Sequence, residues 1–383
     1  MSAMPPAKAD GLVYIYFTMN AGSVIEKLRQ GYNMSRKTAG NRIRSQRQKG
    51  IIMRFDAVYY EPDSLDYPLG KKLKDQFGSL PWIPIESHNA IQEMRDKPNS
   101  EFGRMKRNLI IGTRKTHKYV ENHKVSDYLV PYTSSGCTAM CLYCYLVCNY
   151  NKCAYLRLFV NREQMLDRLI RQGEKSSSPL TFEIGSNSDL VLENTITGNL
   201  EYTIPRFARE GRGKLTFPTK FDMVEPLLDL EHRGKVIFRM SVNPQPLIQK
   251  VELGTSGLCQ RIDAVNQMCA AGYPCGLLIA PVILAEGWKE MYTGLLKELD
   301  KGLSGQMRGQ MFIEIILMTY SYIHRAINSD AFPQAPDLYD KELMTGRGRG
   351  RYCYRPEVRA EAEAFFRTEV KRILGDVQIL YIS

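Results

Sequence analysis

The chain of 383 residues lacks any stretch approaching the roughly 20 consecutive apolar residues that a membrane-spanning helix needs. Its first ten residues, MSAMPPAKAD, also lack the apolar core of a signal peptide. Histidine is scarce, with five in all and none between His123 and His232. The first two absences argue against a membrane protein and a secreted one, so we expect a cytoplasmic protein with no membrane partner.

Cysteine is present in a pattern that does not suit disulfide bonds. The nine cysteines are an odd number, and five of them fall between Cys137 and Cys153. Crowding of this kind is typical of a metal site in a reducing compartment, whereas disulfide frameworks belong to small secreted domains. At 383 residues and 44% hydrophobic, the chain can bury a full core without such cross-links.

Cys137, Cys141 and Cys144 form a CxxxCxxC motif. Three thiolates at this spacing suit three irons of a 4Fe-4S cluster and leave the fourth iron open. An open iron can chelate S-adenosyl-L-methionine (SAM) and pass an electron to its sulfonium, which produces a carbon radical. Two alternatives stay open: structural zinc, which normally takes four protein ligands, and buried thiols without a metal.

One N-terminal segment has no acidic residue. The formal net charge is +11, and eight basic residues fall within residues 27–49 with no acid among them. Two runs of helically spaced apolar residues, separated by a short turn, predict a helix-turn-helix within a small basic helical module, residues 1–54. We expect Arg36, Lys37 and Arg42 to contact DNA, and the alternative is a solvated hairpin packed on the main domain.

After Ile51 the sequence alternates between apolar strand candidates and helical stretches. The predicted strands are Leu109–Ile111, Leu180–Ile184, Leu215–Phe217, Val236–Met240, Leu277–Val282 and Phe312–Leu317. Repeated βα units predict an α/β fold with a parallel sheet, whose ligand lies at the carboxyl ends of the strands. The cysteine motif follows the extended segment Tyr128–Tyr132, so we expect it to occupy such a loop.

Many further motifs are spread from about Ala57 to the C-terminus. They are Val58–Pro62, Asp66–Gly70, Ser87–Asn89, Ile111–Lys115, Cys144–Leu146, Phe182–Glu183, Ser188–Asp189, Gly213–Leu215, Thr219–Phe221, Ala271–Pro274 and Ala280–Pro281. With these motifs the chain resembles the spore photoproduct lyase family, radical SAM enzymes that reverse a thymine dimer made by ultraviolet light in spore DNA. The resemblance implies a partial (β/α) barrel of radical SAM type over residues 55–383, with the cluster loop at its mouth.

The resemblance also implies roles for single residues. The three motif cysteines would bind the cluster, and Tyr143 and Tyr145 would contact SAM and relay hydrogen atoms. The residues expected to hold SAM are Tyr143, Ser188, Lys220, Ser241 and Ala280. Three of them have a structural alternative. Ser188 and Ser241 would be turn or strand-end residues whose hydroxyls form local hydrogen bonds, and Lys220 would be a surface charge.

The chain departs from the family pattern at two positions. Ser186 stands where the family has its hydrogen-donating cysteine, and an alcohol O–H bond is far stronger than a thiol S–H bond. A lesion-contacting Arg-Tyr pair becomes Arg347-Gly348, so the aromatic side chain is lost. Either another thiol, Cys148 or Cys153, returns the hydrogen atom, or the substrate is not the spore lesion.

These features together predict a radical SAM lyase that repairs damaged, thymine-containing DNA, with a 4Fe-4S cluster and SAM as cofactors. Arg347, Arg349 and Arg351, on a glycine-rich and adaptable loop, are expected to contact phosphate or the lesion. We expect an external electron donor such as flavodoxin or ferredoxin, and no stable protein partner. The alternatives are a radical SAM enzyme for another lesion or modified nucleotide, and a catalytically silent iron–sulfur protein that binds DNA.

Overall fold

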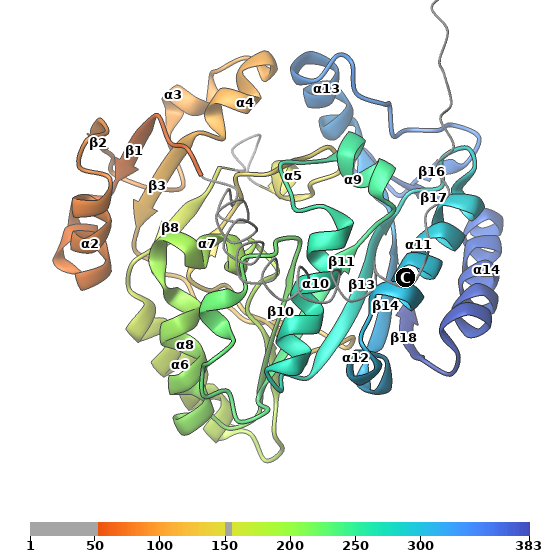
Figure 1. Cartoon of the computed structure of the whole chain (residues 1–383). Coiled ribbons are helices and arrows are strands. Elements are labelled where there is room, and N and C mark those ends of the chain that lie inside the picture. The colour runs from red at the N-terminus through yellow and green to blue at the C-terminus, as the bar shows by residue number, and fades with distance from the viewer. Residues whose placement is uncertain (1–52, 150–154) are drawn as a thin grey trace, which may run out of the picture. The chain divides into compact units, whose positions relative to one another are not determined.

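The computed structural model describes residues 53–149 and 155–383 (Figure 1). The predicted helix-turn-helix, with Arg36, Lys37 and Arg42, lies outside the described residues, as does Cys153. Across the described ranges, no helix has the length and apolarity needed to cross a bilayer.

The larger sheet has eight strands, and its central strands are parallel. In spatial order the strands are β18 (Gln378–Ile382), β14 (Phe312–Leu317), β13 (Cys275–Val282), β11 (Val236–Val242), β10 (Lys214–Thr219), β9 (Thr181–Glu183), β5 (Tyr128–Leu129) and β4 (Val120–Glu121). The terminal pair, β4 and β5, is antiparallel. Strands such as β13 are buried along almost their whole length, as expected for a parallel sheet covered on both faces.

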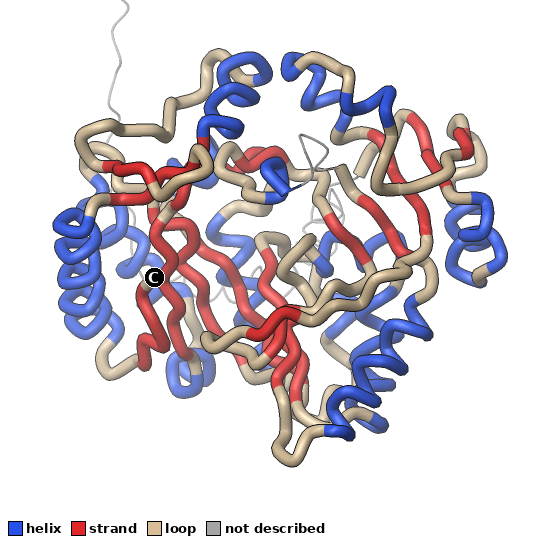
Figure 2. The backbone as a smooth tube through the Cα atoms, turned by 180° about the vertical axis from the view of Figure 1, so that it is seen from behind, coloured by secondary structure: helices blue, strands red, loops and turns tan. Residues whose placement is uncertain are grey.

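The smaller sheet continues the wall and is joined to the larger one by the segment before the cysteine motif. Its strands, in order, are β2 (Trp82–Pro84), β1 (Ala57–Tyr60), β3 (Asn108–Gly112), β8 (Arg157–Phe159) and β6 (Ser134–Ser135). The backbone of Val130 still bonds Glu183 of β9, whereas three residues later Thr133 accepts a bond from Phe159 of β8. The chain therefore crosses from one sheet to the other here, and the strands form the curled wall of a partial barrel (Figure 2).

Helices cover the sheets, each presenting one apolar face to the core. The longer ones are α2 (Pro68–Gln76), α6 (Arg162–Lys175), α7 (Leu190–Thr197), α8 (Asn199–Glu210), α10 (Leu258–Ala270), α11 (Trp288–Gly302), α13 (Tyr322–Ala331) and α14 (Pro356–Leu374). Short ones are α3 (Gln92–Arg95), α4 (Phe102–Met105), α5 (Leu146–Asn149), α9 (Gln245–Val251) and α12 (Gly305–Gln310). In α6, Met165, Leu166, Leu169 and Ile170 recur at helical spacing and are all buried, so this stripe is what the helix packs into the core.

Two small antiparallel sheets complete the fold near the cysteine motif. β7 (Met140–Cys141) pairs with β12 (Glu252–Leu253), and a three-stranded sheet has the order β15 (Thr319–Ser321), β17 (Arg351–Tyr354), β16 (Met344–Gly346). The first pair brings a cysteine of the motif against a segment more than 100 residues away in sequence.

The α/β fold, the partial barrel and all six predicted strands are confirmed, with small differences at the strand ends. The path into the cysteine loop differs from the prediction. We expected the loop to follow a strand of the parallel sheet at Tyr128–Tyr132, but β5 contains only Tyr128–Leu129. The loop instead follows β6, because the chain has by then changed sheets to pair antiparallel with β8.

Candidate active site

A cavity of about 520 Å³ opens at the carboxyl ends of the parallel strands. Residues at or just beyond the ends of β9, β10, β11, β13 and β14 line one side of it, and the cysteine loop lines the other. Its lining includes most of the predicted site residues: Cys137, Cys141, Cys144, Tyr143, Tyr145, Ser186, Lys220, Ser241 and Ala280. The structure thus brings together residues that are up to 143 positions apart in sequence.

The cysteine loop is held mainly through its backbone. Gly136 begins it with a φ of 77° and forms a parallel bridge to Ser188, a conformation that favours glycine. Lys106 Nζ donates to the Cys137 carbonyl at 2.6 Å, and Leu142 N donates to the Val251 carbonyl at 2.9 Å. These bonds come from different parts of the chain and fix the loop over the cavity.

Helix α13 contributes two further contacts to the same loop. His324 Nε2 lies 2.9 Å from the Cys144 carbonyl, and Asn328 Nδ2 donates to the Leu142 carbonyl at 2.8 Å. His324 and Asn328 are four residues apart and therefore lie on one face of the helix. Sequence interpretation missed both, since neither belongs to a recognisable motif.

The chemistry of the three thiols fits an iron–sulfur cluster. All three are free and partly exposed, and burial raises the pKa of Cys137 to about 12 and that of Cys141 still further. Thiolates in such surroundings need strong positive charge, which a bound metal centre supplies. Within the described residues, no three side chains of the His, Cys, Asp or Glu type converge as ligands of a single metal ion. A cluster does not require such convergence, because each thiolate binds a different iron.

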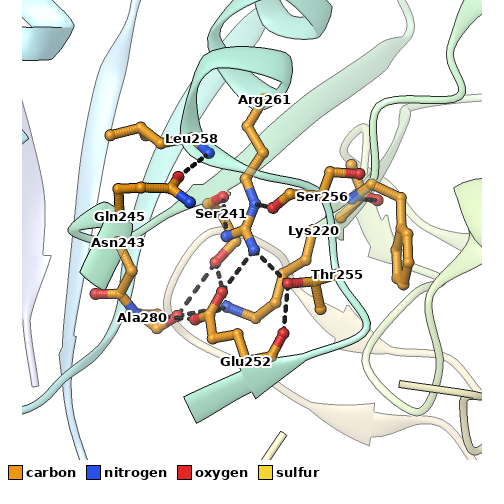
Figure 3. A network of polar contacts seen from close by, with 12 residues as sticks. Lys220, Ser241, Asn243, Gln245, Glu252, Thr255, Ser256, Leu258, Arg261 and Ala280 are labelled. Atoms are coloured by element: carbon orange, nitrogen blue, oxygen red, sulfur yellow. Dashed lines mark hydrogen bonds and ion pairs between the residues drawn. The ribbon is translucent and has the colours of Figure 1, made fainter. Parts of the chain in front are cut away.

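Lys220 is the centre of the polar side of the cavity (Figure 3). Its Nζ donates to Ser241 Oγ at 2.7 Å, to the Ala280 carbonyl at 2.8 Å and to Glu252 Oε1 at 2.9 Å. It also lies 5.6 Å from the centre of the Tyr143 ring. Three residues expected to hold SAM, from the ends of β10, β11 and β13, are therefore in direct contact.

Glu252 is a site residue that sequence interpretation missed. Its fully buried carboxylate accepts from Tyr143 Oη at 2.5 Å, from Asn243 Nδ2 at 2.9 Å and from Arg261 Nη2 at 2.6 Å, besides Lys220. Burial opposes its negative charge, but Lys220 and Arg261 hold the pKa of Glu252 well below its usual range. The only sequence signal was an acid between the apolar residues Val251 and Leu253.

Glu252 also connects the two halves of the site. It lies on β12, opposite Cys141 of β7, so the strand that pairs with a cysteine of the motif also carries the partner of Lys220. Arg261 Nη1 donates to the Ser241 carbonyl at 3.1 Å and extends the network to β11. One carboxylate therefore contacts both Tyr143 of the cysteine loop and Lys220.

The predicted catalytic residues Tyr145 and Ser186 meet at the cavity. Tyr145 Oη donates to the Ser186 carbonyl, and both residues line the cavity. Tyr145 is 51% exposed, which leaves much of its ring open at the mouth. Ser186 follows the end of β9, the position at which a parallel sheet presents a reactive group.

Other predicted residues lie around the cavity without lining it. Ser188 Oγ lies 2.6 Å from Ser134 Oγ, which in turn bonds the buried carboxylate of Glu193. Cys148 lies on α5, and its side chain is not among those described. Among the remaining cysteines, Cys269, Cys275 and Cys353 are buried, whereas Cys259 is exposed.

The arginine loop is a defined turn, not the adaptable loop expected from its glycines. Arg347 N donates to the Arg351 carbonyl at 2.8 Å, and Arg351 N donates to the Gly348 carbonyl at 3.1 Å. Gly348, Arg349 and Gly350 have φ values of 81°, 53° and 67°, so glycine serves here to make a tight hairpin between β16 and β17. The side chains of Arg347, Arg349 and Arg351 are exposed and do not line the cavity.

Comparisons with known proteins give the family of the chain. The family model described as spore photoproduct lyase matches residues 53–383. Spore photoproduct lyase of Bacillus subtilis is 35% identical over 309 residues, covering 78% of this chain and 90% of that protein. The enzyme of a Geobacillus species is 29% identical over 335 residues, covering 85% and 98%.

Solved structures give the same result. A spore photoproduct lyase mutant superposes with a TM-score of 0.81 at 28% identity, and the match covers 88% of this chain and 100% of the mutant. A second mutant, with a TM-score of 0.80, the same 28% identity and coverage of 86% and 99%, has bound AdoMet and dinucleoside spore photoproduct. The family match, the sequence relatives and the shared fold show that this chain belongs to the spore photoproduct lyase family.

Proposed function

We propose that this protein is a radical SAM lyase that reverses the spore photoproduct, a thymine photolesion of DNA. The observation that carries the proposal is the cavity in which three free thiols face the Lys220, Ser241 and Ala280 contacts. A relative of the same fold holds AdoMet and dinucleoside spore photoproduct together, which supports the same pair of ligands here.

Each side of the cavity has its own task in this proposal. Cys137, Cys141 and Cys144 hold the cluster, and Lys220 with Ser241 forms the polar wall against which SAM binds. When bound, the cluster and SAM supply the carbon radical that attacks the lesion. Glu252 fixes Lys220 and neutralises its charge, so the wall is ordered before any ligand arrives.

Much of the rest of the cavity wall is apolar. Phe221, Leu278, Ile316, Leu317 and Pro281 all line it with apolar groups. Closed, apolar surroundings exclude water and prevent the side reactions of reactive species. We infer that these residues confine the radical to the lesion.

Hydrogen return is where this chain differs from its family. Ser186 lies in the cavity with Tyr145 bonded to its carbonyl, so Tyr145 is within reach of the position that the family's thiol occupies. The strong O–H bond of Ser186 makes its hydroxyl a poor hydrogen donor. In our proposal Tyr145 relays hydrogen, and a thiol of the chain, Cys148 or Cys153, is its source.

The surface contacts belong to the same proposal. Arg347, Arg349 and Arg351 of the hairpin bind the damaged DNA, and the N-terminal module, residues 1–54 with Arg36, Lys37 and Arg42, adds sequence-independent affinity. An external donor such as flavodoxin or ferredoxin reduces the cluster. We place the enzyme in the cytoplasm, where its thiols stay reduced and its DNA substrate is present.

The test is a repair assay with the full chain. The cluster is reconstituted anaerobically, and SAM, a reductant and an oligonucleotide with one spore photoproduct are added. We expect restored thymine together with 5′-deoxyadenosine, both measured by chromatography. 5′-Deoxyadenosine without thymine would indicate another lesion, and the absence of both products would indicate a silent DNA-binding protein.

A Ser186→Cys variant in the same assay tests the altered donor position. We expect cleaner thymine product and fewer trapped adducts, because the weaker S–H bond returns hydrogen faster. The matched control is Ser178→Cys, which places a thiol on an exposed residue ahead of β9 that does not line the cavity. An unchanged product distribution in Ser186→Cys would contradict the assignment of this position.

A further inference from the structure

A second cavity, of about 470 Å³, lies on the outer face of the barrel wall, and we call it the outer cavity. Successive side chains of a strand point to opposite faces of its sheet. On β5, Leu129 lines the active-site cavity and Tyr128 lines the outer cavity. On β9, Glu183 lines the active-site cavity, whereas Phe182 stacks on the Tyr128 ring. The two cavities therefore lie on opposite faces of one wall, and among the described residues none lines both.

One side of the outer cavity is a row of basic side chains on α6, which is labelled in Figure 1. Arg168, Arg171 and Lys175 follow one another at spacings of three and four residues, so they lie on one face of the helix. All three are exposed, and none forms an ion pair or hydrogen bond with another residue of the described ranges. The described residues that line the cavity include no carboxylate, and Asp167, next to Arg168 in sequence, is already paired with Arg206 at 2.6 Å. The positive charge of this row therefore has no partner in the described part of the chain.

The other side of the outer cavity consists of aromatic side chains. Tyr119 and Tyr128 are half-buried, their ring centres lie 6.4 Å apart, and both rings pack on Phe182. Neither hydroxyl forms a hydrogen bond with any other described residue, so both can donate to a ligand. His117 completes this side, and burial, followed by the charge of Arg168, lowers the pKa of His117. An anion in the cavity would offset the charge that disfavours a protonated His117.

These side chains match the chemistry of a nucleotide. Guanidinium groups bind phosphate through paired hydrogen bonds, and an ammonium group adds a compact positive charge. From Arg168 to Lys175 the helix rises by about 10 Å, so the row suits a chain of phosphates better than a single one. The tyrosine rings provide a surface on which a flat base can stack. The volume of about 470 Å³ is within the usual range of small-molecule sites.

We propose that the outer cavity binds a nucleoside triphosphate, with its phosphates on Arg168, Arg171 and Lys175 and its base against Tyr119 and Tyr128. The site is separate from the active-site cavity and takes no part in the radical chemistry. It does not depend on the proposed function, because the residues that form it lie on the outer face of the wall. Any effect of the nucleotide on repair would have to pass through the shared wall, in which β5 lines both cavities.

Isothermal titration calorimetry of ATP into the full chain with its reconstituted cluster tests the proposal. Saturating SAM keeps ATP out of the active-site cavity, and reductant and divalent cations are left out so that SAM is not cleaved and the phosphates stay free. We expect the double variant Arg168→Gln, Arg171→Gln to bind ATP at least about tenfold more weakly than the parent protein, because charge-assisted hydrogen bonds are lost. Tripolyphosphate should bind the parent protein about tenfold more weakly than ATP, because it has no base to stack on the tyrosines.

The matched control is Arg233→Gln, Arg308→Gln, which removes the same charge from two exposed residues that have carboxylate partners. This control should bind ATP like the parent protein. All four arginines are exposed, so the melting temperature and the visible cluster absorbance should be the same in every variant.

Four results would overturn the proposal or a part of it. Parent-like affinity in Arg168→Gln, Arg171→Gln would contradict the site, and equal weakening in the control would reduce the effect to net charge. Tripolyphosphate binding as tightly as ATP would contradict a nucleotide as the ligand, and displacement of ATP by single-stranded DNA would assign the cavity to the DNA backbone instead. Failure of thymine repair would count against the proposed function alone, because the ATP titration contains no lesion.

Discussion

At the scale of single residues, the polar side of the site depends on one carboxylate. Glu252 is completely buried and is paired with Lys220 and Arg261, while Tyr143 and Asn243 donate to it as well. A buried charge with this many donors is stable only while all of them are present. Loss of the Glu252 carboxylate would leave Lys220 and Arg261 without their ion-pair partner in largely buried surroundings.

We therefore expect Glu252→Gln to lower the free energy of unfolding by about 3 to 5 kcal/mol, the usual cost of breaking a buried ion pair. Chemical denaturation followed by circular dichroism measures the change. The matched control is Glu363→Gln on the exposed side of α14, where Arg367 lies 2.7 Å away and the expected loss is about 0.5 kcal/mol or less. Equal losses in the two variants would contradict the role given to Glu252.

The same residue shows what the sequence could not reveal. Cysteine spacing was enough to propose the cluster ligands, because a cluster imposes a short local pattern that can be seen without a structure. Glu252, Arg261 and Asn243 are distant in sequence from Lys220, and no spacing rule connects them. Glu252 comes next to the cysteine loop through the pairing of β7 with β12. Each of these strands has only two residues, which is too short for an alternating hydrophobic pattern to be recognised in the sequence.

At the scale of elements, α13 acts as a support for the cysteine loop. Asn328 and His324 reach two carbonyls of the loop, and Tyr322, the first residue of the same helix, lies beside the arginine hairpin. One helix thus contacts both the cluster loop and the surface expected to bind DNA. The ordering of the cysteine loop depends in part on how firmly this helix is docked.

Removing one of these supports should loosen the loop. In Asn328→Ala the Leu142 carbonyl loses its partner, which costs about 1 kcal/mol of local stability. We expect the cluster to be lost several times faster on exposure to air, measured as the decay of visible absorbance. Arg325→Ala on the same helix removes an exposed ion pair with Asp337 and a cation–π contact with Tyr339, neither of which touches the cysteine loop, and should decay like the parent protein. Identical decay in both variants would contradict a supporting role for Asn328.

Elements were the most predictable level of this structure. The strands β11, β13 and β14 are largely apolar, buried runs between polar turns, so their burial made them visible in the sequence. The switch of Thr133–Ser135 to the smaller sheet was not visible, because it depends on which edge strand is available. The tight turn at Gly348–Gly350 was also missed, because glycine permits both a flexible loop and a hairpin.

At the scale of the whole molecule, the feature to consider is the net charge, to which the described residues and the others contribute together. The formal net charge of +11 favours a polyanionic partner, and residues 27–49 carry eight basic side chains and no acid. Affinity of this kind is independent of sequence and falls with salt, because bound arginine and lysine release counterions from DNA.

We expect the triple variant Arg36→Gln, Lys37→Gln, Arg42→Gln to bind undamaged duplex more weakly than the parent protein. Its slope of log K against log salt should fall by about 0.9 for each phosphate that the variant no longer neutralises. The charge-matched control is Arg233→Gln, Lys289→Gln, Arg308→Gln, three exposed residues that already have carboxylate partners. If both triple variants bind equally weakly, net charge alone and not the N-terminal segment accounts for the binding.

The crossing of the chain between the two sheets has a mechanical consequence. The backbone of residues 130–135 is hydrogen-bonded to β9 at its start and to β8 at its end. The cysteine loop begins directly after this segment. A change in the curvature of the barrel wall would therefore move the start of the loop relative to Lys220. Conversely, a rigid cluster bound by that loop would stabilise the connection between the two sheets. Damage to the cluster by oxygen would then lower the stability of the barrel wall itself.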